Sequence, residues 1–97
     1  MLIGLTTFEI HLPHSRSLKE KRRVVKGVVD RIHDRYRVSV LESDHHDLLQ
    51  RTQISVVMAA RDESEIDRIM TQIRTVVDHR PEGYVTLWNE RILEGLE

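Results

Sequence analysis

Residues 53–77, QISVVMAARDESEIDRIMTQIRTVV, contain two hydrophobic patterns in succession. The continuous apolar run in residues 53–60 is typical of a strand. Asp62, with Glu65 three positions later, has the spacing of a helix N-terminal cap. Apolar side chains then recur at helical spacing, at Ile66, Ile69, Met70, Ile73, Val76 and Val77. The segment therefore predicts a strand followed by an amphipathic helix.

The segments on either side extend this pattern. RPEG (80–83) ends the helix, and YVTLWNERIL (84–93) predicts the last strand. Near the start, residues 2–12 alternate loosely and are partly apolar on both faces, which predicts a central strand that Pro13 ends.

A second helix is predicted between these strands. Ser17 and Glu20 have the spacing of a capping box, so the helix begins at Ser17. VSVLES (38–43) reads as a short strand, and residues 44–51 are polar enough to predict a loop. The buried stripe of the helix is expected to consist of Leu18, Val25, Val28, Val29, Ile32 and Tyr36.

The predicted order is βαββαβ over a single domain of residues 1–97. Two helices on one face of a four-stranded antiparallel sheet, the α+β ferredoxin-like arrangement, is the simplest way to pack these elements. That arrangement leaves the other sheet face open, with Ile3, Leu5 and Val57 as candidates to lie on it. Contiguous exposed apolar surface usually has a partner, so we expect a homodimer whose face includes Ile3, Leu5 and Trp88.

Composition excludes several classes of site. The 97 residues contain no cysteine, which excludes disulfides, thiolate zinc sites and cysteine nucleophiles. The N-terminal residues lack the basic region of a signal peptide, and polar residues interrupt their apolar run. We therefore expect a cytoplasmic protein with no membrane partner.

The formal net charge of −1 hides an uneven distribution. Residues 1–40 carry nine Lys and Arg against four Asp and Glu, whereas residues 41–97 carry six against twelve. Much of the positive charge lies in SRSLKEKRR (15–23). The candidate RNA-binding residues are Arg16, Lys19, Lys21, Arg22, Arg23 and Lys26.

These cations allow two interpretations. On a helix, Lys19, Arg22, Arg23 and Lys26 fall within an arc of about 100°, which is either an ordinary solvated face or a phosphate-binding surface. Cations at a helix N-terminus are repelled by the positive end of the macrodipole and so lower helix stability. Because this placement is unfavourable for stability, it favours the interpretation that the cations bind phosphate. The few aromatic residues argue against reading of single strands by stacked bases, so structured RNA contacted through its backbone fits better.

The loop SDHHDLLQR (43–51) offers a further candidate site. Adjacent side chains point apart and a closed metal site needs ligands from a second segment, such as His11 or His14, so we predict no metal and no cofactor. No catalytic motif is present, and a non-enzymatic protein is expected. The loop is interpreted as an interaction loop formed by Asp44, His45, Asp47, Gln50 and Arg51.

The chain resembles the YlxP-like family of small bacterial proteins in two stretches, SLKEKRRVVK (17–26) and VSVLESDHHDLLQR (38–51). The resemblance covers essentially the whole chain. The resemblance implies a ferredoxin-like fold and genomic company with translation-initiation and ribosome-maturation genes. It implies no catalytic mechanism.

Two functions are therefore expected as alternatives. The first is a ribosome- or RNA-associated factor that binds small-subunit ribosomal RNA in assembly or initiation through the basic helix arc. The second is a homodimeric protein-interaction or small-ligand module that uses the open sheet face.

Overall fold

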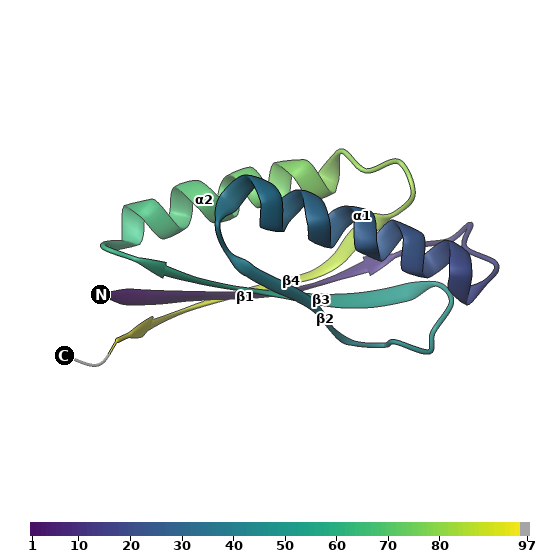
Figure 1. Cartoon of the computed structure of the whole chain (residues 1–97), viewed down its shortest axis with the longest axis horizontal. Helices are drawn as coiled ribbons and strands as arrows, with labels where there is room; N and C mark the ends of the chain where they lie inside the picture. The colour runs from purple at the N-terminus through teal and green to yellow at the C-terminus, as the bar shows by residue number, and fades with distance from the viewer. Residues whose placement is uncertain (96–97) are drawn as a thin grey trace.

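The computed structural model describes residues 1–95 and has the element order βαββαβ (Figure 1). The elements are β1 (Leu2–His11), α1 (Leu18–Tyr36), β2 (Ser39–Asp44), β3 (Arg51–Ala60), α2 (Glu63–Asp78) and β4 (Tyr84–Glu94). Each predicted helix and strand is present. β2 has the predicted length but lies one residue further along the chain than predicted, and β3 begins two residues earlier than predicted, at Arg51. The loop predicted over residues 44–51 therefore shortens to residues 45–50.

The four strands form one antiparallel sheet in the order β2-β3-β1-β4, and both helices cover the same face (Figure 1). The predicted α+β ferredoxin-like fold is confirmed. β1 is a central strand, as its apolar residues on both faces predict, and it pairs with β3 from Leu2↔Ala60 to His11↔Arg51. Its other edge pairs with β4.

Alternation along the central strands divides the residues between the core and the open face. Phe8 and its register partner Ile54 face the helices and are fully buried. The helices contribute the apolar stripes that their spacing predicts, including Ile32 from α1 and Ile73 from α2, both fully buried. Odd-numbered residues of β1, such as Ile3 and Leu5, lie on the opposite, uncovered face.

One β-bulge changes the phase of β4. The register with β1 shifts between Glu9 and Ile10, because Glu9 pairs with Leu87 and Ile10 pairs with Val85. Thr86 is therefore the extra residue. Each side chain after it lies on the face opposite to the one that simple alternation from Tyr84 predicts.

Neither helix in the described range is long and apolar enough to cross a membrane.

Candidate nucleic-acid interface

The start of α1 is fixed by a cap that the sequence predicts. Ser17 has extended backbone angles, and its hydroxyl accepts a hydrogen bond of 3.1 Å from the backbone N–H of Glu20. The Glu20 carboxylate accepts a 2.8 Å bond from the backbone N–H of Arg16, one residue before the position expected for a capping box. Side chains thus accept hydrogen bonds from two N–H groups at the helix start. These bonds fix the first residue of α1 and so the positions of the cations that follow it.

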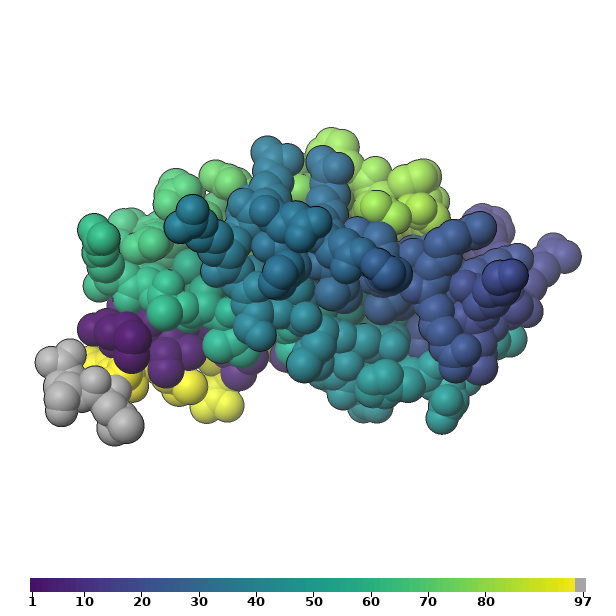
Figure 2. Space-filling model, in the orientation of Figure 1, coloured from purple at the N-terminus to yellow at the C-terminus, as the bar shows by residue number. Residues whose placement is uncertain are grey.

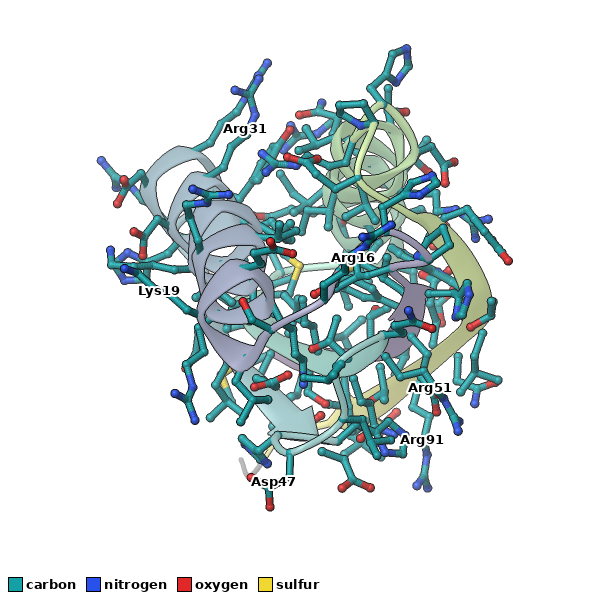
Figure 3. All side chains as sticks on the ribbon, turned by 90° about the vertical axis from the view of Figure 1, so that its right-hand side faces the viewer. Arg16, Lys19, Arg31, Asp47, Arg51 and Arg91 are labelled. Carbon is teal, nitrogen blue, oxygen red and sulfur yellow. The ribbon has the colours of Figure 1, made fainter. Side chains whose placement is uncertain are left out.

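Four cations form the surface that we call the basic face: Lys19, Arg22, Arg23 and Lys26. All four are exposed. Lys26 pairs with Asp30, and this hydrogen bond raises the pKa of Lys26 above its ordinary value. Within residues 1–95, the side chains of Lys19, Arg22 and Arg23 make no ion pair. Figure 3 shows Lys19 on the flank of α1 that faces away from α2.

Arg16 and Lys21, also predicted to bind RNA, lie outside the basic face. Arg16 precedes the helix and lies on its α2 side in Figure 3. Lys21 was predicted to bind RNA, and the structure does not fit this role, because its side chain is only 1% exposed. The Lys21 ammonium lies 3.0 Å from the Glu42 carboxylate and also donates to the backbone carbonyl of His45. A buried charge needs such partners, so Lys21 is a structural residue.

The Lys21 contact is one of several that hold the loop of residues 45–50 in place. The amide of Gln50 donates to the carbonyls of Pro13 and Ser15, at 3.2 and 3.3 Å. The Gln50 carbonyl in turn accepts a 2.9 Å bond from the Leu12 N–H. The loop is therefore fastened to the segment that connects β1 with α1.

The turn that opens the loop has its own support. The Asp44 carboxylate accepts a 2.7 Å bond from the N–H of His45, which has left-handed backbone angles with φ 64°. Asp47 is exposed at the loop tip and its side chain makes no hydrogen bond within the described residues (Figure 3).

Arg51 and His45 meet a carboxylate on the open sheet face. Arg51 donates to Oε1 of Glu9 through Nη2 and Nε, at 2.6 and 3.2 Å. His45 Nε2 lies 3.5 Å from the same oxygen. The Arg51 hydrogen bonds are the main reason that the pKa of Glu9 lies below its usual value, and burial opposes them.

Of the predicted dimer face, two residues are placed as expected and one is not. Ile3 and Leu5 lie half-buried on the open face. Trp88 lies on the helix-covered face, because the Thr86 bulge reverses the alternation of β4. Its ring stacks on Phe8 with centroids 4.9 Å apart, and the Arg74 guanidinium lies 4.9 Å from its centroid. The placement of Trp88 in the dimer face was therefore wrong.

The apolar part of the open face includes Val57, as predicted, and Leu93, which periodicity did not identify. Leu93 pairs with Ile3, and Val57 pairs with Leu5, so these four side chains are neighbours. Val57 is 42% exposed and Leu93 43%. Pairing register would have identified Leu93, which no single strand pattern assigns to a face.

Residues 1–95 contain no group of three or more His, Asp or Glu side chains placed to hold a metal ion. The histidines and aspartates of the loop are instead used in the contacts described above, or exposed singly.

Comparison with known proteins places the chain in a family. A family model described as "Protein of unknown function (DUF503)" matches residues 3–89. The chain belongs to the DUF503 family. The curated relative "Uncharacterized protein YlxP" of Bacillus subtilis (strain 168) is 27% identical over 81 residues, which cover 84% of this chain and 88% of the relative. The YlxP-like resemblance is thus confirmed. The DUF503 match includes α1 and the loop of residues 45–50, the parts joined by the Lys21 contacts.

Proposed function

We propose that this DUF503 protein is a non-enzymatic, cytoplasmic RNA-binding factor that contacts structured RNA of the small ribosomal subunit in assembly or initiation. The observation that carries the proposal is the exposure of Lys19, Arg22 and Arg23 in the first turns of α1 without an ion-pair partner in the described part of the chain. The ribosomal context comes from the family resemblance.

The two helices differ in a way that supports binding over simple solvation. α2 begins with the Asp62 cap followed by Glu63 and Glu65, which favour the positive end of the helix dipole. The first turn of α1 has only Glu20 as an acidic residue, and that carboxylate is engaged by the Arg16 N–H. Cations gathered there cost stability, and an anionic partner offsets that cost.

The geometry favours recognition of the phosphate backbone. The basic face carries Lys and Arg only, with no aromatic side chain on which a base could stack. Lys21, on the buried side of the same helix turns, pairs with Glu42 and so ties α1 to β2. The backbone positions that carry the cations are thereby held, and cations repeated along a helix suit the phosphate backbone of double-helical RNA.

Co-sedimentation of the protein with small ribosomal subunits over a salt series tests this proposal. Three to four phosphate contacts predict that log affinity falls with log salt with a slope of about −2 to −4. The absence of binding at low salt, or binding that salt does not weaken, would contradict the proposal.

A second candidate function is self-association through the open sheet face. It is favoured by the cluster of Ile3, Leu5, Val57 and Leu93, which lies across three neighbouring strands. Leu41 of β2, 56% exposed, extends the cluster, because it pairs with Ser55, which lies two residues before Val57 on the same face of β3. A second copy of the chain that covers these side chains would remove them from water. The two functions use different faces and are compatible.

A further inference from the structure

A groove lies between α1 and α2, on the outer side of the helical layer. Its volume is about 690 Å³. Its walls come from the second half of α1, the second half of α2 and residues 79–82. In Figure 2, side chains of α1 rise at the top of the molecule beside the yellow-green segment that follows α2. None of the residues of the basic face lines this groove.

Cationic groups dominate the lining. Arg31 and Arg35 of α1 face His79 and Arg80 from the segment after α2. Glu82 is the one carboxylate among the lining residues, and Arg80 already binds it through Nε and Nη2, at 3.2 and 3.1 Å. Neither Arg31 nor Arg35 has an ion-pair partner in the described range. The groove therefore carries an excess of positive charge.

A glycine in α1 makes room for one of these cations. A Cβ at Gly27 would lie 3.2 Å from Nη2 of Arg80, so the bare backbone lets this guanidinium lie against the helix. Glycine in a helix interior lowers helix stability. Its presence here lets the Arg80 guanidinium, only 26% exposed and bound to Glu82, lie against α1 at the wall of the groove.

The other lining groups suit a ligand that is only partly charged. Tyr36 and Val76 supply apolar surface, while Thr71, Gln72 and Thr75 supply hydroxyl and amide groups. The Arg35 guanidinium lies 5.6 Å from the centroid of the Tyr36 ring, a contact that holds this cation at the groove wall. His79 donates from Nδ1 to the Thr75 carbonyl at 2.7 Å, so its Nε2 remains available to a ligand.

We infer that this groove binds a nucleoside phosphate. Guanidinium groups bind phosphate oxygens in a bidentate manner. Three arginines line this groove, and two of them, Arg31 and Arg35, have no carboxylate partner in the described range. The volume falls within the range of roughly 300–1,000 Å³ of small-molecule sites and far exceeds that of an inorganic anion. The apolar and hydroxyl-bearing walls then receive the base and the sugar. This site shares no residue with the basic face, so either proposal can fail without the other.

Isothermal titration calorimetry with ATP and GTP, alongside tripolyphosphate and adenosine, tests the ligand class. We expect at least one nucleotide to bind at least about tenfold more tightly than tripolyphosphate, and adenosine to bind more weakly than either. Equal affinity for tripolyphosphate would reduce the groove to a simple polyanion surface and overturn the inference. The absence of nucleotide binding at millimolar concentration would also overturn it.

Two matched variants locate the site. Arg31→Ala/Arg35→Ala should weaken nucleotide binding by at least about tenfold, because two charge-assisted contacts are lost. Arg22→Ala/Arg23→Ala removes the same charge from the same helix outside the groove and should change the affinity less than about twofold. Equal weakening in both variants would show a non-specific charge effect and contradict the assignment.

Gly27→Ala tests the position of Arg80 without changing any charge. The added methyl would lie 3.2 Å from Nη2 of Arg80, so the guanidinium has to shift by a few tenths of an ångström, and binding should weaken while helix content is retained. Circular dichroism confirms that the variant is folded. Wild-type affinity in folded Gly27→Ala would contradict a role for the position of Arg80 in this site.

Discussion

The Lys21 ammonium lies 3.0 Å from Oε2 of Glu42, and this ion pair joins α1 to the edge strand β2 beneath the surface. The side chains are 1% and 16% exposed, respectively. The same Glu42 oxygen accepts a 2.5 Å hydrogen bond from the Thr52 hydroxyl of β3. One carboxylate thus connects a helix with two strands, at the end of the molecule where the basic face begins.

Lys21→Met should destabilise the protein by about 3 kcal/mol, because it leaves the Glu42 charge partly buried without its cation. Urea unfolding measures the change. Adding Glu42→Gln removes the unpaired charge and keeps an acceptor for Thr52, so the double variant should recover part of the loss. The exposed neighbour Lys19→Met is the control and should change stability by less than about 0.5 kcal/mol. A Lys21→Met protein as stable as this control would contradict the role of the pair.

Acid should remove a second contribution, that of Glu9 and Arg51. The hydrogen bonds from Arg51 hold the pKa of Glu9 below its ordinary value of 4.5. A pKa lowered by folding adds stability that is present above pH 4.5 and is lost as the pH falls through the folded-state pKa. Arg51→Met should therefore be less stable than wild type near neutral pH.

The difference between the two proteins should shrink below pH 4.5, as Glu9 is protonated in both. Urea unfolding at about pH 7 and about pH 3 measures it. A difference in stability that stays constant across this range would show that Arg51 acts through packing alone.

Local periodicity predicted the fold well because each element has a clear pattern of its own. The helices that begin after Ser17 and after Asp62 both follow from an N-terminal cap and the apolar spacing within one segment. Lys21 also had a local signal, which was missed. Its spacing to Val25, Val28 and Ile32 places it on the buried stripe of α1, so its charge had to find a buried partner.

Pairing between strands could not be predicted in the same way. The face on which Trp88 lies depends on the bulge at Thr86, and a bulge is visible only in the register with β1. The Gln50 contacts to Pro13 and Ser15 join segments more than 30 positions apart. The groove between the helices likewise depends on how α1 packs beside α2, and the apolar spacing within either helix does not determine that packing.

The open sheet face can be tested with two adjacent residues of β4. Leu93, 43% exposed, lies on the open face opposite Ile3, whereas Ile92, 40% exposed, lies on the helix-covered side opposite Gly4. If two copies pair through the open face, Leu93→Glu should convert the dimer to a monomer, because it places a charge in the apolar contact. Ile92→Glu should leave the mass unchanged.

Multi-angle light scattering on wild type and both variants decides the question, and equal stability of the variants confirms a fair comparison. A monomeric wild type, or a dimer that survives Leu93→Glu, would contradict pairing through this face.

Arg22→Glu/Arg23→Glu tests the basic face. The change removes two cations and adds two anions, so the affinity for small ribosomal subunits at low salt should fall at least about 100-fold. Stability should change by less than about 0.5 kcal/mol per site, because both side chains are exposed. Glutamate early in α1 is also favourable to the helix dipole.

The matched control is Arg61→Glu/Arg68→Glu, which changes the net charge equally at the start of α2, the opposite end of the helical layer from the basic face (Figure 1). Both arginines are exposed and their side chains make no ion pair within the structurally described residues. This control should co-sediment nearly as wild type does, apart from a modest loss from long-range charge, which salt screens. Equal losses in the two variants would indicate a non-specific effect of net charge. If Arg22→Glu/Arg23→Glu melts normally and still binds the subunits, the basic face is a solvated helix surface and the proposed RNA contact is wrong.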